Sequence, residues 1–110
     1  MALPHAQSGE VASVRPLGAQ LSSATTSAIL KAGQLEVMRV VLPAGKAMRE
    51  HQTQGEATVQ CLEGAVEFHA GDSVQLLQPG DFVHLAPRSP HALKAVKDSS
   101  VLLTICLLPG

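Results

Sequence analysis

Short apolar runs alternate with glycine and proline turns along most of the chain, and no helical period lasts longer than a turn or two. Runs of this kind, rich in branched apolar residues and bounded by turn residues, predict β-strands. Roughly eight to ten strands are expected, at residues 25–31, 34–42, 49–53, 57–62, 65–69, 73–77, 82–86, 92–96 and 101–107. So many short, evenly spaced strands predict an all-β jelly roll or double-sheet barrel.

The run from residue 34 to 42 is apolar on both of its alternating faces. A strand of this kind is expected to be covered on both sides. Its two faces consist of Leu35, Val37 and Val41 on one side and of Met38, Val40 and Leu42 on the other.

Two histidines end segments of similar design. His51 follows Gly45 by six residues, and His91 follows Gly80 by eleven residues. Gly80 lies in Gln78-Pro79-Gly80-Asp81, which predicts a type II turn because Pro stands second and Gly third. Each segment therefore begins at a turn, continues as a short extended run and ends on an imidazole. We expect the two rings to meet in one cavity.

The two segments, within residues 42–64 and 77–93, resemble the two sequence motifs of the cupin superfamily in order and spacing. The resemblance extends over about residues 34–107 and is to a small, single-domain, RmlC-like cupin. It implies a cupin-type jelly roll, or double-stranded β-helix barrel, with a metal site inside. Because the superfamily includes dioxygenases, isomerases, decarboxylases, sugar-binding sensors and storage proteins, the resemblance implies a fold rather than one activity.

Carried over position by position, the resemblance matches His51 and His91 to the first and last histidines of the family's metal site. Thr53 stands where the second histidine is expected, and Ala57 stands where the glutamate is expected, one residue after Glu56. The second motif also departs from the family pattern, with Ala86 in place of Pro, Arg88 in place of Gly and Ala95 in place of Asn.

These departures leave two imidazoles, whereas catalytic zinc or iron usually has three protein ligands. The candidates for a third ligand are Glu56, through a local bulge, Gln60, in a different register, and His84. One divalent transition metal (Fe, Mn, Ni or Zn) would then be bound. The alternative is a metal-free barrel in which the two rings hydrogen-bond through water or a small anion.

The function expected from these residues is binding of a small polar or carboxylate-bearing ligand at a degenerate metal site. Its ligand-binding residues would be Arg49, His51, Thr53 and His91. Arg49 precedes His51 by two residues and is expected on the same strand face, where it would hold a carboxylate, unless it is an exposed residue at a strand edge. The alternative function is a metal-dependent enzyme, a dioxygenase or isomerase, that uses His51 and His91.

Composition sets the remaining expectations. The chain of 110 residues is 45% hydrophobic and only 15% charged, which favours a homodimer because apolar surface is left for a partner subunit. A net charge of −1 argues against nucleic acid and against an anionic membrane as partners. The first 14 residues lack the pattern of a signal peptide, so a cytoplasmic protein is expected. Residues 1–9 are expected to form a flexible arm and residues 10–110 a single domain.

Several polar residues are expected to have structural roles. Cys61 and Cys106 lie in apolar strand surroundings and are expected to be buried, reduced thiols. Residues expected on solvated faces are His5, Glu63, Glu67, His69 and Lys94.

Overall fold

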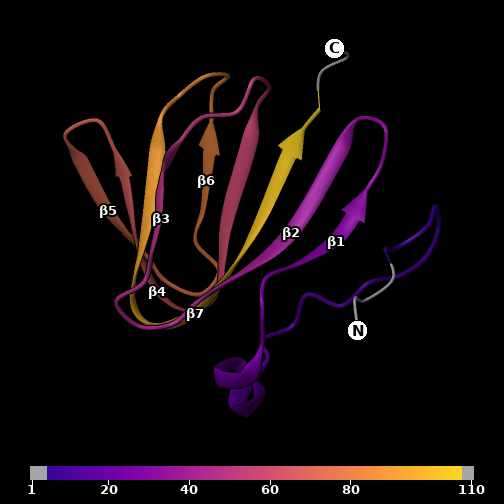
Figure 1. The fold of residues 1–110 in the computed structure, drawn as a ribbon, viewed down its shortest axis with the longest axis horizontal. Helices are drawn as coiled ribbons and strands as arrows, with labels where there is room; N and C mark the ends of the chain where they lie inside the picture. The colour runs from indigo at the N-terminus through magenta and orange to yellow at the C-terminus, as the bar shows by residue number, and fades with distance from the viewer. Residues whose placement is uncertain (1–4, 108–110) are drawn as a thin grey trace.

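The structure, a computed structural model, describes residues 5–107. Within that range a short 3-10 helix, η1 (Gly18–Ser23), precedes seven strands. The strands are β1 (Ser27–Lys31), β2 (Leu35–Leu42), β3 (Ala47–His51), β4 (Ala57–Ala70), β5 (Ser73–Leu77), β6 (Phe82–Leu85) and β7 (His91–Cys106), and all of their pairings are antiparallel (Figure 1). The all-β jelly-roll prediction is therefore confirmed.

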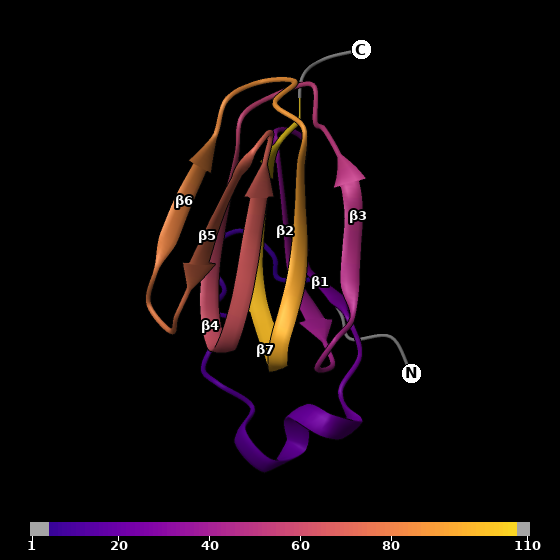
Figure 2. The ribbon, with the colours of Figure 1, turned by 90° about the vertical axis from the view of Figure 1, so that its left-hand side faces the viewer.

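Two long strands, β4 and β7, pair with each other along most of their length and contribute to both layers of the barrel. Residues 99–106 of β7 pair with β2, and residues 57–60 of β4 pair with β6, which gives the layer β1-β2-β7-β4-β6. The other ends, residues 91–94 of β7 and 66–70 of β4, pair with β3 and β5. Figure 2 shows the two layers from the side.

The corner between the layers lies at Gly64, where the pairing of β4 with β7 shifts between Cys61 and Val66. Gly64 has φ 87°, and a side chain there would run into Ser99 and the carbonyl of Asp98. The hydroxyl of Ser99 accepts a hydrogen bond from the Ala65 amide at 3.0 Å, which supports the bend. A bulge bends a strand without ending it.

This bend corrects the strand count expected from the sequence. Residues 57–62 and 65–69 both lie in β4. Residues 92–96 and 101–106 both lie in β7, and Leu107 follows the end of that strand. The glycine and polar residues between them mark corners rather than turns between separate strands.

The core fills the space between the layers. Buried residues from both layers form one cluster, which consists of Val40, Leu42, Ala57, Val59, Cys61, Val66, Phe68, Leu77, Leu85, Leu93, Ala95, Val101 and Leu103. The free thiol of Cys61 belongs to this cluster, and burial raises its pKa, whereas Cys106 is half-buried. No helix in residues 5–107 is long and apolar enough to cross a membrane.

The N-terminal segment covers the outer face of β2 and β7 and one end of the barrel. Leu21 of η1 is buried, and η1 lies beyond the ends of the strands (Figures 1 and 2). The amide of Ala6 donates to the carbonyl of Ile29 in β1 at 2.8 Å. Of the predicted arm, residues 1–4 lie outside the described range. The second half of β2 is therefore covered on both sides, with Val40 and Leu42 in the core and Arg39 buried beneath the segment, whereas Leu35 at the start of the strand is 44% exposed.

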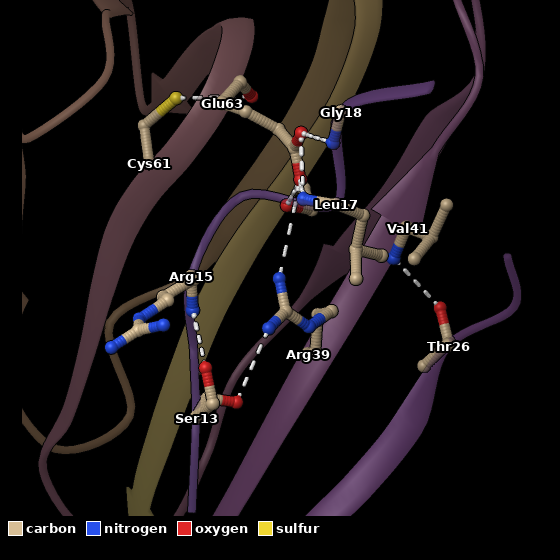
Figure 3. Close-up of polar contacts among 10 residues, drawn as sticks. Ser13, Arg15, Leu17, Gly18, Thr26, Arg39, Val41, Cys61 and Glu63 are labelled. Atoms are coloured by element: carbon tan, nitrogen blue, oxygen red, sulfur yellow. Dashed lines mark hydrogen bonds and ion pairs between the residues drawn. The ribbon is translucent and has the colours of Figure 1, made fainter. Parts of the chain in front are cut away.

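One carboxylate holds this segment in place, as Figure 3 shows. Glu63 accepts hydrogen bonds from the amides of Leu17, at 3.0 and 3.1 Å, and Gly18, at 3.1 Å, and from the Ser100 hydroxyl at 2.6 Å. The guanidinium of Arg39 lies 4.0 Å from the same carboxylate. The prediction that Glu63 lies on a solvated face is wrong, because its side chain is only 13% exposed.

The environment of Glu63 decides its protonation. Burial by itself raises the pKa of this carboxyl, but the hydrogen bonds from Leu17, Ser100 and Gly18 and the charge of Arg39 outweigh burial. The net effect is a pKa below the ordinary glutamate value of 4.5. Glu63 therefore remains an anion and a hydrogen-bond acceptor at neutral pH.

Replacing Glu63 by Gln is expected to lower the free energy of unfolding by about 2–4 kcal/mol, because charge-assisted hydrogen bonds are lost and Arg39 is left buried without its counter-ion. The more exposed Glu67 provides the control, since E67Q alters only a hydrogen bond to His69. Urea unfolding of both variants measures the difference. Equal stabilities would contradict the role given to Glu63.

The same variant predicts a pH dependence. The folded pKa of Glu63 is lowered, so the stability that Glu63 contributes is complete above its ordinary pKa of 4.5 and is lost as the pH falls below that value. The stability of wild type should therefore fall more steeply with acidification than that of E63Q.

Candidate functional site

The last residue of β3 and the first residue of β7 lie opposite each other as a register pair, His51 and His91. Their ring centroids are 4.2 Å apart with an interplanar angle of 58°. Both strand ends lie at the end of the barrel away from η1 (Figures 1 and 2). The structure thus brings together the two histidines that the sequence singles out, from positions forty residues apart.

A bulge in β3 turns His51 toward its partner. The pairing of β3 with β7 shifts between Met48 and His51, so strict alternation of the faces fails there. Met48 packs against the core, and His51 three residues later contacts His91. Arg49 is exposed. The two-residue spacing therefore gives no reason to place Arg49 on the face of His51, which corrects the argument made from the sequence.

Hydrogen bonds to the backbone fix the tautomer of both rings. Nδ1 of His51 lies 3.1 Å from the carbonyl oxygen of Arg49, and Nδ1 of His91 lies 3.2 Å from that of Ser89. Because a carbonyl oxygen only accepts, each Nδ1 must carry the hydrogen. In the neutral ring this leaves the lone pair on Nε2, free to accept a hydrogen bond or to bind a metal.

Nε2 of His91 is the acceptor that stands out. His91 is 1% exposed, and its Nε2 is buried without a hydrogen-bond partner in the described part of the chain. The ring of Phe68 stacks at 6.3 Å and 24°. Burial lowers the pKa of His91, the Ser89 carbonyl opposes this shift, and the charge of His51 lowers the pKa further, for a net decrease. His91 is thus held as a neutral acceptor.

The loops that follow β3 and precede β7 are tied together beside the pair. The amide of Arg88 donates to the carbonyl of Thr53 at 2.8 Å, and the Thr53 hydroxyl donates to the carbonyl of Gly55 at 2.8 Å. Gly55 leaves no room for a side chain, because a Cβ there would meet the carbonyl of Cys106. Thr53, predicted to bind ligand, uses its hydroxyl within this loop.

The third metal ligands considered from the sequence lie elsewhere. His84 lies between two core residues of β6 and is more than half exposed, and its Nε2 contacts the carboxylate of Glu56 at 2.5 Å. Gln60 lies between the buried residues Val59 and Cys61 of β4 and therefore faces away from the core. Within residues 5–107 no three His, Cys, Asp or Glu side chains form a group that could hold a metal.

Comparison with known proteins identifies the fold family. The family profile described as "Cupin domain" matches residues 38–107. A cupin superfamily protein from Desulfitobacterium hafniense superposes with a TM-score of 0.76 at 16% identity, over 89% of this chain and 95% of that chain. An RmlC-like cupin protein from Desulfovibrio desulfuricans gives a TM-score of 0.74 at 25% identity, over 88% of this chain and 97% of that chain.

An enzyme is also among the structural neighbours. A salicylate 1,2-dioxygenase from Pseudaminobacter salicylatoxidans superposes with a TM-score of 0.62 at 21% identity, over 64% of this chain. The superposed region is only 20% of the dioxygenase chain, and at this identity the likeness shows the fold alone. No curated protein matches the chain by sequence.

The lowered pKa of His91 predicts both a titration and a stability profile. His91 should titrate below the ordinary value of 6.5, and replacing His51 by Gln should raise the pKa of His91 by removing a nearby charge. Because the folded state binds the proton less well, the stability that His91 contributes is complete above pH 6.5 and falls as the pH drops below that value. An NMR titration of the imidazole protons measures the pKa, and a value at or above 6.5 would contradict the buried, neutral ring.

Proposed function

Because the chain belongs to the cupin family, we propose that it binds a small polar or carboxylate-bearing ligand inside its barrel, at His51 and His91. The observation that carries the proposal is the Nε2 atom of His91, a buried acceptor without a partner beside a second imidazole. A buried polar atom left unpaired costs roughly 1–3 kcal/mol. A ligand atom that donates to this nitrogen, or a metal ion that binds it, offsets that cost.

The two rings fit a divalent transition metal as two of its ligands, so the site is a degenerate form of the family's metal site. Metal-bound histidines typically donate their second ring nitrogen to a carbonyl or carboxylate, and both Nδ1 atoms here contact backbone carbonyls. Imidazole nitrogens suit Fe, Ni and Zn, and Mn occurs where oxygen ligands complete the set. A metal held by His51 and His91 would polarise the carboxylate or hydroxyl oxygen of a bound ligand.

The alternative function is a metal-dependent enzyme, a dioxygenase or isomerase, that uses the same two histidines. A salicylate dioxygenase is among the structural neighbours, so the fold is compatible with this chemistry. Catalytic zinc and non-haem iron usually have three protein ligands, and the described residues supply two imidazoles and no third side chain of the usual types. This difference favours binding over catalysis as the proposed role.

Replacing His51 or His91 by Ala is expected to reduce uptake of Ni²⁺ or Zn²⁺ by roughly a hundredfold or more, because only one imidazole would remain. H69A is the matched control, since His69 is paired with Glu67 and is 38% exposed. Isothermal titration of protein purified without affinity resin or chelator gives the affinities, and metal analysis of the same material gives the native content. Equal affinities in H51A, H91A and H69A would refute the site.

We also propose a homodimer in the cytoplasm. Large apolar side chains are exposed on the outer faces of the barrel, among them Val74 at 56%, Phe82 at 60% and Val96 at 55%. Exposed apolar area of this kind favours burial against a partner subunit. Both cysteines are free, as is usual in a reducing compartment.

Sedimentation equilibrium at micromolar concentration is expected to give twice the chain mass of 11.4 kDa. Replacing Phe82 by Lys should shift the mass toward the monomer, because the side chain lies on the outer face. A wild-type protein that is monomeric at this concentration would contradict the dimer.

A further inference from the structure

The loop that leads from β6 into β7 contains a turn with an unusual residue in it. The Ser89 amide donates to the carbonyl of Ala86 at 3.2 Å, with Pro87 second and Arg88 third in the turn. Arg88 has φ 61° and is the one residue other than glycine with positive φ in residues 5–107. This left-handed conformation is disfavoured for L-residues, because Cβ crowds the following carbonyl oxygen.

The chain builds the same turn a second time with glycine in that position. The Asp81 amide donates to the carbonyl of Gln78 at 2.8 Å, with Pro79 second and Gly80, at φ 94°, third, which confirms the turn predicted from the sequence. In both turns the amide of the third residue also donates to a neighbouring segment at 2.8 Å, from Gly80 to Cys61 and from Arg88 to Thr53. Glycine therefore meets every backbone requirement of this turn without strain.

The strained turn, unlike the other, lies at the histidine pair. The residue that follows Arg88 is Ser89, whose carbonyl orients the ring of His91. The carbonyl of Thr53 accepts the hydrogen bond from the Arg88 amide, and Thr53 follows His51 by two residues. The backbone of Arg88 thus connects the two segments that carry the imidazoles. Its side chain is exposed, and it forms no ion pair with a carboxylate in the part of the chain that the structure describes.

The chemistry of the pair limits what can bind there. Because each Nδ1 donates to a backbone carbonyl, Nε2 is the ring atom that offers a lone pair, so the pair binds a hydroxyl or another hydrogen-bond donor and does not by itself hold a carboxylate. A guanidinium binds a carboxylate with two parallel hydrogen bonds. Backbone strain retained at a site where glycine would relieve it is typical of a functional residue.

We propose that Arg88 is a ligand-binding residue and that the ligand is a small hydroxy acid, whose hydroxyl donates to Nε2 of His91 beside the ring of His51 while its carboxylate binds the Arg88 guanidinium. This inference rests on the proposed function and adds to it the class of ligand and a residue that determines specificity. The strain at Arg88 is a cost in stability that the turn at Gly80 does not have.

The test compares two hydroxy acids, salicylate and glycolate, with their amides, salicylamide and glycolamide, which keep the hydroxyl and lose the charge. Affinity is measured from the shifts of the His51 and His91 imidazole signals on titration. In wild type each acid is expected to bind more tightly than its amide. In R88G the affinity for the acids should fall roughly tenfold, which corresponds to the loss of one charge-assisted contact, and the affinity for the amides should not change. R88K should retain part of the preference for acids, because lysine keeps the positive charge but cannot form the two parallel hydrogen bonds of a guanidinium.

Thermal unfolding supplies the second readout. R88G is expected to melt no lower than wild type, because glycine relieves the left-handed strain, whereas G80R should melt lower because it introduces the same strain into the matching turn. A side chain at Gly80 would meet no atom within 4 Å, so steric clash does not confuse that comparison. A merely structural role for Arg88 would make R88G less stable and leave the preference for acids unchanged.

Two further results would overturn the proposal. One is a wild-type protein in which neither acid shifts the signals of His51 and His91. The other is a loss of preference for acids in R49A but not in R88G, which would assign the carboxylate to Arg49, an exposed residue whose backbone carbonyl contacts His51. Failure of the proposed function is recognised separately, because metal uptake would then be unchanged in H51A and H91A.

Discussion

The corner in β4 and β7 is the constraint on which the rest of the structure depends. Because β7 passes through it without interruption, one end of the strand anchors β2 and the other carries His91 and pairs with β3. Gly64 permits the bend in β4, and the Ser99 hydroxyl of β7 accepts a hydrogen bond from the amide of Ala65, the residue after Gly64. Glu63, the residue before Gly64, binds the N-terminal segment from the outside. A single local geometry therefore forms the two layers, aligns the histidines and fixes the segment that covers the outer face.

The buried polar side chains separate into two groups with different energetics. In residues 5–107 they are Arg39, His91, Ser99 and Ser100. Three of the four belong to the corner, where Ser99 and Ser100 are hydrogen-bonded and Arg39 faces the charge of Glu63. His91 lies outside this network with its Nε2 unpaired. Nη1 of Arg39 also has no hydrogen-bond partner in the described residues, but it lies 4.0 Å from the carboxylate of Glu63, whereas Nε2 of His91 has no such counter-ion there. Since buried polar groups in stable cores are normally satisfied, Nε2 of His91 indicates where a ligand belongs.

Local signals account for what the sequence predicts well. The type II turn at residues 78–81 follows from Pro79 and Gly80 alone. The contact between His51 and His91 follows from the two segments that each begin at a turn glycine and end on a histidine within one barrel. Strand positions are also local, because apolar runs between turns are visible in the chain. The sequence could not distinguish the corners within β4 and β7 from turns between separate strands, because a glycine at a bulge and a glycine in a turn look alike in a sequence.

The errors concern contacts that depend on distant parts of the chain. Nothing in the sequence next to Glu63 indicates that its side chain is buried. It is buried because residues 13–18, more than forty positions earlier in the chain, fold across it. Arg49 was assigned to the face of His51 by strict alternation, which the bulge in β3 removes. Glu56, just before β4, contacts His84 of the paired strand β6, which lies 28 residues away along the chain. Side-chain partners of this kind are set by register, and register is a property of the assembled sheet.

A strained backbone and an unpaired buried acceptor lie together at one end of the barrel. The left-handed Arg88 and the unpaired Nε2 of His91 both cost stability, and they lie three residues apart in one loop and strand end. Either could be removed locally, by glycine at Arg88 or by an apolar ring at His91, without altering the corner that determines the fold. Natural sequences keep such local conflicts mainly where function requires them, so the coincidence of two in the same loop indicates selection for binding rather than for stability.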